Sequence, residues 1–101
     1  MLALDDGQNI IIDTWMITGA QIRASRALLG IGQKELARLS GLSLPTVQRM
    51  EASDGVVHAV VDSLEKVVNA INEAGVELIA AGARSEGAGR GVRLLDRTKH
   101  A

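Results

Sequence analysis

The stretch QKELARLSGLSLPTVQRME, residues 33–51, decides the fold that the sequence predicts. Its first eight residues have the spacing of a short amphipathic helix, with Leu36 and Leu39 expected inside. Gly41 is placed to end that helix in a left-handed turn. Ser43 can then cap a second helix, which tolerates the chain's one proline in its first turn. A connection of three or four residues forces the two helices to cross steeply.

Further helices are expected on both sides of this pair. Thr18 with Gln21 has the pattern of a capping box and predicts a helix over about 19–29, with Leu28 among its apolar positions and Gly30 at its end. A loop rich in serine, aspartate and glycine follows residue 51. Apolar residues at spacings of three and four then predict a helix over about 60–74. Its buried stripe is expected to be Val61, Leu64, Val67, Val68 and Ile71.

The two ends of the chain favour extended structure. Residues 1–17 form an arm in which the β-branched run 10–12 favours a short strand. Residues 76–95 predict an antiparallel β-ribbon around a glycine-rich loop, followed by a flexible tail over 96–101. The domain proper is expected to cover 18–75. Apolar residues outside it are candidates for a dimer contact: Ile11, Trp15, Leu78, Val92 and Leu94.

Composition limits the classes of protein that fit. With 101 residues and 47% apolar residues, the chain has room for one domain with one modest core. It has no cysteine, which suits a reducing cytoplasm. We expect no membrane span, because no apolar run approaches eighteen residues. His58 and Asp62 lie four residues apart, but with so few potential ligands we expect neither an enzyme nor a metal site, and no cofactor.

The charges are sorted along the chain. The net charge of −1 alone argues against a nucleic-acid partner. Residues 18–50, however, carry five basic side chains against Glu35, while residues 51–79 carry six acids against Lys66. The middle of the chain is therefore basic, which a uniformly solvated surface would not require.

The frame Q-x-x-L-A-x-x-x-G-x-S-x-x-T-V-x-x-x-E, from Gln33 to Glu51, resembles the helix-turn-helix of the phage-repressor and Cro family, also called the XRE family. The similarity covers about 18–74 and includes a leading R-x-x-R-x-x-x-G. It implies a mainly α, four-to-five-helix, lambda-repressor-like domain, in which the short C-terminal β-ribbon takes the place of the fifth helix that many members carry. It also implies that the helix after Ser43 enters the major groove of DNA while the helix before it lies across the backbone.

The resemblance also implies roles for single residues. Arg26 and Glu51 are expected to form a structural ion pair. Gln33 is expected to contact a phosphate, helped by the positive end of its helix. The side chains of Leu44 and Pro45 cannot donate hydrogen bonds. Direct readout of bases is therefore left to Thr46, Gln48 and Arg49. The expected DNA-binding residues are Gln33, Lys34, Ser43, Leu44, Pro45, Thr46, Gln48 and Arg49, with Arg23 and Arg38 as further phosphate contacts.

Three functions fit these observations. The first is a sequence-specific double-stranded DNA-binding regulator of transcription, acting as a homodimer on a palindromic operator. Repression is expected rather than activation, because blocking a promoter needs only occupancy. The second is an antitoxin-like module that binds both DNA and a toxin-like protein. The third is a helix-turn-helix scaffold that contacts protein only.

Overall fold

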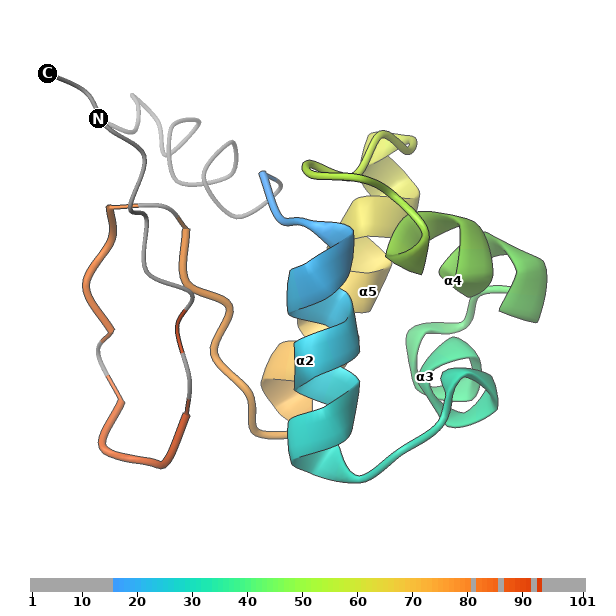
Figure 1. Ribbon diagram of the computed structural model, residues 1–101. Coiled ribbons are helices and arrows are strands. Elements are labelled where there is room, and N and C mark those ends of the chain that lie inside the picture. The colour runs from blue at the N-terminus through green and yellow to red at the C-terminus, as the bar shows by residue number, and fades with distance from the viewer. Residues whose placement is uncertain (1–15, 81, 86, 92, 94–101) are drawn as a thin grey trace, which may run out of the picture.

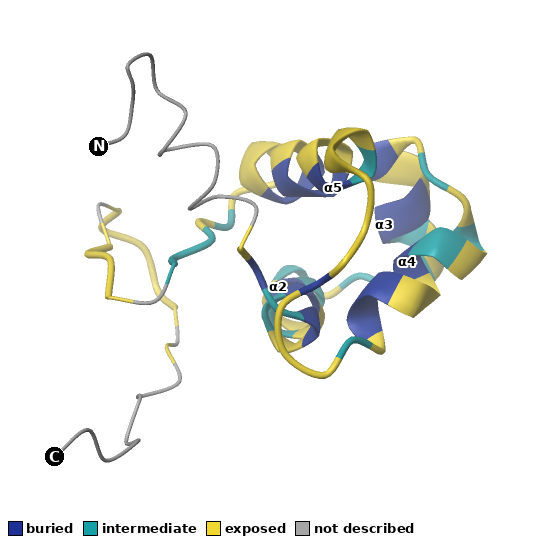
Figure 2. Cartoon of the chain, turned by 90° about the horizontal axis from the view of Figure 1, so that it is seen from above, coloured by how far each residue is buried: buried dark blue, intermediate teal, exposed yellow. Residues whose placement is uncertain are grey.

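The computed structural model describes residues 16–80, 82–85, 87–91 and 93. This part is mainly helical and contains four helices: α2 (Gly19–Leu29), α3 (Gln33–Ser40), α4 (Leu44–Glu51) and α5 (Val61–Glu73). In Figure 1, α2 lies in front of α5, with α3 and α4 to one side and the C-terminal segment to the other. Figure 2, seen from above, shows α2 apart from α5. The predicted strand over 10–12 and four dimer candidates lie outside the described residues: Ile11, Trp15, Val92 and Leu94.

The helices begin and end where the local sequence predicts. Thr18 Oγ1 accepts a hydrogen bond from Gln21 N at 3.0 Å, and Thr18 N donates to Gln21 Oε1 at 2.9 Å, so the predicted capping box is present. Gly30 and Gly41 end α2 and α3 with φ of 70° and 73°. This left-handed conformation strains residues with a Cβ, so glycine stops each helix cleanly.

One hydrophobic core holds the four helices together. α3 packs against both α4 and α5, and α2 packs against α4. The core is built from the inner faces of all four helices and from the two segments beside α2: Ile17, Ile22, Leu36, Ala37, Val47, Met50, Val57, Leu64, Val67, Val68, Ala70 and Ile71. None of the helices in the described residues has both the length and the apolar character to cross a membrane.

Three apolar side chains expected in the core lie at the surface. Leu28 is 48% exposed, Leu39 42% and Val61 52%. Leu36 and its buried neighbours on α3 set the inner face of that helix, and Leu39 lies about 100° of rotation away from the centre of that face. Val61 is the first residue of α5 and precedes the turn at which the helix meets the core. These two core assignments were wrong, as was that of Leu28.

The predicted C-terminal β-ribbon does not form in the described part of residues 76–93, which contains no strand. Val76 and Leu78 instead pack against the helical core, so Leu78, a dimer candidate, is half-buried within its own chain. Gln21 Nε2 donates to Ile79 O at 2.8 Å and ties the segment to α2.

A side chain takes the place of a strand partner in this segment. The Glu77 carboxylate accepts hydrogen bonds from Ser85 Oγ at 3.0 Å and from Gly87 N at 3.2 Å. These bonds close a loop without backbone pairing. Interior glycines weaken a strand because they lose the most conformational entropy and add no packing, and this segment is rich in them.

Candidate functional site

The α4 helix has an inner and an outer face. Val47 and Met50 are 0% and 3% exposed and point into the core. Pro45, Gln48 and Arg49 are exposed on the other side. The helix starts at Ser43, whose Oγ accepts from Thr46 N at 3.3 Å, and Pro45 sits in the first turn, where it removes no helical hydrogen bond.

The hydroxyl groups at the start of α4 are connected to Arg49. Ser43 Oγ and Thr46 Oγ1 are 2.9 Å apart, and Arg49 Nη2 donates to Thr46 Oγ1 at 3.3 Å. The Arg49 side chain therefore lies back along its own helix. A guanidinium has five N–H donors, so Arg49 retains donors for a partner outside the chain.

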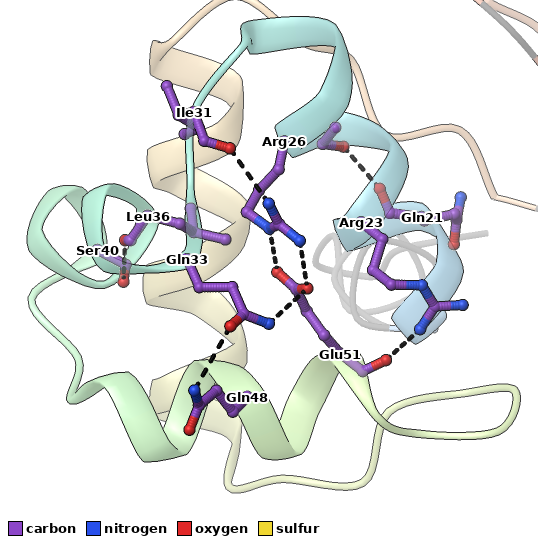
Figure 3. Close-up of polar contacts among 10 residues, drawn as sticks. Gln21, Arg23, Arg26, Ile31, Gln33, Leu36, Ser40, Gln48 and Glu51 are labelled. Atoms are coloured by element: carbon purple, nitrogen blue, oxygen red, sulfur yellow. Dashed lines mark hydrogen bonds and ion pairs between the residues drawn. The ribbon is translucent and has the colours of Figure 1, made fainter.

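A polar network joins the end of α4 to α2 and α3 (Figure 3). Glu51, only 3% exposed, accepts from Arg26 Nε at 2.6 Å and from Arg26 Nη2 at 2.9 Å. Gln33 Nε2 donates to the same carboxylate at 3.0 Å, and Arg26 Nη1 donates to Ile31 O at 3.2 Å. The predicted Arg26–Glu51 ion pair is present. It is a bidentate pair, which fixes direction as well as distance.

The network keeps Glu51 charged. Burial works to raise the pKa of its carboxyl group. Hydrogen bonds from Arg26 and Gln33, with the positive charges of Arg26 and Arg23, outweigh that effect and hold the pKa below its ordinary value. The pKa of Arg26 is raised in turn, chiefly by its hydrogen bonds to Glu51.

Gln33 connects this buried network to the outer face of α4. Its Oε1 lies 3.5 Å from Gln48 Nε2, while its own Nε2 is directed at Glu51. The side chain predicted to contact a phosphate is therefore half-buried and already held at both ends. Its position at the first residue of α3 still places it at the positive end of a helix.

The C-terminal end of α4 rests on the start of α2. A Cβ on Gly19 would lie 2.7 Å from both Glu51 O and Ser53 O, so only glycine allows this approach. Arg23 Nη1 donates to Glu51 O at the same place. Arg23, predicted as a phosphate contact, thus bonds the last turn of α4, where a cation also complements the helix dipole. Sequence reasoning missed Gly19, because its role depends on how closely the end of α4 approaches α2.

The remaining cations differ in their partners. Arg38, predicted as a phosphate contact, forms an ion pair with Glu35 one turn away on α3, with Nε 3.0 Å from Oε1, and this pairing lowers the pKa of Glu35. Lys34 and Arg49 are exposed and have no acidic partner within the described residues. Lys34 is therefore an exposed cation on α3 and Arg49 an exposed cation on α4, and neither charge is neutralised by an acid in the described residues.

A shallow cleft of about 260 Å³ lies between the end of α4 and the start of α5. Its polar lining consists of Thr46, Arg49, His58 and Ser63, with Met50 among its apolar walls. It is smaller than the ~300–1,000 Å³ typical of small-molecule sites. Within the described residues, no group of three or more His, Asp or Glu side chains gathers as metal ligands would.

Comparison with known proteins gives no relative. No protein-family model matches the chain, and no curated protein and no solved structure matches it.

Proposed function

We propose that this protein is a sequence-specific double-stranded DNA-binding regulator of transcription, with α3 and α4 as its helix-turn-helix and α4 as the helix that enters the major groove. The observation that carries the proposal is the way α4 is held. Its inner face and its end are fixed by the core, by Gly19 and by the Glu51 network, while Gln48 and Arg49 are exposed on its outer face. Groups that read bases must be held rigidly, and the buried network provides that rigidity.

The distribution of charge supports a phosphate-rich partner. Three of the five basic residues between 18 and 50 are occupied within the chain, since Arg26 and Arg38 pair with acids and Arg23 bonds a backbone carbonyl. The two that have no acidic partner in the described part, Lys34 and Arg49, belong to the proposed reading pair of helices. Arg49 suits guanine, which accepts two hydrogen bonds from one guanidinium, and Lys34 suits a phosphate as a point charge.

Two copies are needed for useful specificity. A single reading helix contacts few base pairs, whereas a homodimer presents two such helices about 34 Å apart, one turn of DNA. We therefore propose a homodimer on a palindromic operator in the cytoplasm. The proposed mode of action is repression, because blocking a promoter needs only occupancy.

Selection of bound duplexes from random DNA, followed by binding isotherms at several salt concentrations, tests the proposal. Arg49→Ala should weaken binding to the selected site about 10- to 100-fold and relax preference at one base pair of each half-site. Lys34→Ala should weaken binding to all sequences alike and lower the slope of log K against log salt by about 1 for each copy bound.

Lys66→Ala is the matched control, because Lys66 lies on α5, is exposed, and pairs with Asp62 at 3.2 Å. It should change neither affinity nor salt slope. A wild-type protein with no salt-dependent DNA binding would show that the proposed function is wrong.

A further inference from the structure

A chain of hydrogen bonds leads from the exposed face of α4 to the buried Glu51 carboxylate, with every donor pointing toward that carboxylate. Gln48 Nε2 donates to Gln33 Oε1 at 3.5 Å, and Gln33 Nε2 donates to Glu51 Oε1 at 3.0 Å. Arg26 holds the carboxylate from the other side, through Nε at 2.6 Å and Nη2 at 2.9 Å. Figure 3 shows the four side chains joined in this order, with Gln48 at the end far from Arg26.

The carboxylate determines which way round the Gln33 amide lies. An ionised carboxylate accepts hydrogen bonds and donates none, so it can bond only the NH2 group of Gln33. The pKa of Glu51 is held below its ordinary value, so the group is ionised at neutral pH. If the Gln33 amide turned over, its oxygen would lie against a carboxylate oxygen, and two acceptors repel. The carbonyl oxygen of Gln33 is therefore the atom that faces Gln48.

The acceptor beside Gln48 orients the Gln48 amide in turn. Gln48 is exposed, and its Nε2 is the atom that faces Gln33. A carboxamide has two N–H donors and one carbonyl oxygen. With one N–H directed at Gln33, Gln48 keeps one donor and one acceptor for a partner outside the chain.

Adenine is the base that uses both of these groups. Its edge in the major groove carries an acceptor, N7, beside a donor, the N6 amino group, and a glutamine amide pairs with both. Guanine presents two acceptors there, so it can accept from the N–H but leaves the carbonyl oxygen of Gln48 unpaired. Thymine presents one acceptor and cytosine one donor, so each also leaves one group of Gln48 unpaired.

We propose that Gln48 reads adenine in the major groove, and that Gln33 is the positioning residue that sets the direction of its hydrogen bonds, with Glu51 as the acceptor that orients Gln33. This inference rests on the proposed function and adds the base that one reading residue recognises. Arg49 is the next residue of α4 and points about 100° away around the helix, which leaves it to a different base pair.

Competition between duplexes that differ at one base pair tests the proposal. Each adenine of the selected site is replaced in turn by guanine, with its partner base, and the ratio of the two affinities is measured on one protein preparation. Such a ratio does not depend on how much of the protein is folded. At one adenine of each half-site, wild type should prefer adenine about 10- to 100-fold, as expected for a bidentate pair. Gln48→Ala should lower that preference at least about fivefold.

Gln33→Met separates a positioning role from a phosphate contact. Methionine is unbranched and has no amide, so the variant leaves both Gln48 and the Arg26–Glu51 pair in place. The Gln48 amide is then free to turn over, and the preference for adenine at the same base pair should fall at least about fivefold. Lys34→Ala is the matched control, because Lys34 is the next residue of α3 and is assigned to a phosphate. It should weaken binding to both duplexes by the same factor, as Gln33→Met would if Gln33 only contacted a phosphate.

A measurement without DNA tests the chain of hydrogen bonds itself. Glu51→Gln replaces the acceptor by an amide that can also donate, so it should move the side-chain NH2 resonances of both Gln33 and Gln48 in nitrogen-edited NMR spectra. In a Gln33→Met background, the same substitution should leave the Gln48 resonances where they are. Gln48 resonances that ignore Glu51→Gln when Gln33 is present would overturn the positioning role.

The outcomes separate this inference from the function on which it rests. Salt-dependent DNA binding without an adenine preference that Gln48→Ala lowers would overturn adenine readout and leave the proposed function standing. An unchanged preference in Gln33→Met would overturn Gln33 as the positioning residue. A wild-type protein that binds no DNA would overturn the proposed function, and adenine readout with it. A preference lowered by both Gln48→Ala and Gln33→Met but not by Lys34→Ala supports the inference.

Discussion

The two faces of α4 are built by opposite means. On the inner side of α4, the polar groups are bonded within the chain. At its last residue, the Glu51 carboxylate contacts Arg26 of α2 and Gln33 of α3. The outer side carries polar groups whose bonds are few or long, such as Gln48 at 3.5 Å from Gln33. The side of α4 that is held rigidly and the side that is free to bind a partner are therefore about half a helical turn apart. Gln33 connects the two, because it bonds both Glu51 and Gln48.

The largest effect on stability should come from Glu51, at the buried end of α4. Glu51→Ala leaves the Arg26 guanidinium and the Gln33 amide without their acceptor, and removing one partner of a buried pair costs about 3–5 kcal/mol. Because Arg26 is 22% exposed, water can solvate it in part, so we expect roughly 2–4 kcal/mol of lost stability. Urea unfolding measures it. A loss below about 0.5 kcal/mol, the range of an ordinary surface substitution, would show that the network does not anchor α4.

The next effect tests the backbone contact between α2 and α4. Gly19→Ala inserts a Cβ 2.7 Å from two carbonyl oxygens, so the end of α4 must shift, at a cost of about 1–3 kcal/mol. Gly32→Ala is the control, because a Cβ there meets nothing within 4 Å and φ is −91°. Melting temperatures of the pair should differ by several degrees. Equal values would mean that the approach of α2 to α4 adjusts without cost.

Acid should lower the free energy of unfolding of the wild-type protein, because it protonates Glu51. The pKa of Glu51 is lower in the folded chain than the ordinary value of about 4.3. The folded state therefore gains stability from this carboxylate above that value, and the gain is lost as the pH falls through the folded pKa. Stability measured between about pH 6 and pH 3 should fall less steeply in Glu51→Gln than in wild type. If the stability of wild type and of Glu51→Gln fell equally with pH, the acid sensitivity would come from other carboxylates.

The inner face is also the part that sequence predicted best. Glycines, a capping threonine and apolar spacing are local signals, and they placed the four helices within a residue or two of their observed bounds. The pairing of Arg26 with Glu51 is not local, and it was predicted only because a family frame placed the two residues. Gly19 and the bond from Gln21 to Ile79 depend on how distant segments approach, which spacing along the chain does not encode.

The C-terminal segment was predicted less well. Short β-branched runs favour a strand only if a partner edge is near, and here Val76 and Leu78 pack against the helical core. The phosphate contacts of Arg23 and Arg38 stay predictions, and the carbonyl and the carboxylate that these side chains contact could not be read from the sequence. Apolar spacing also assigned Val61 to the core, although it is 52% exposed at the first residue of α5.

The smallest effect on stability should come from Arg49, on the outer face of α4. Arg49→Ala removes an exposed side chain whose one hydrogen bond within the described residues runs to Thr46 Oγ1 on its own helix at 3.3 Å. Its unfolding free energy should lie within about 0.5 kcal/mol of wild type, as for surface substitutions generally. The same variant should bind the selected DNA site about 10- to 100-fold more weakly. Denaturant curves and binding isotherms on one protein preparation measure both quantities. If stability and affinity fell together, Arg49 would belong to the anchor, and the division of α4 into two faces would be wrong.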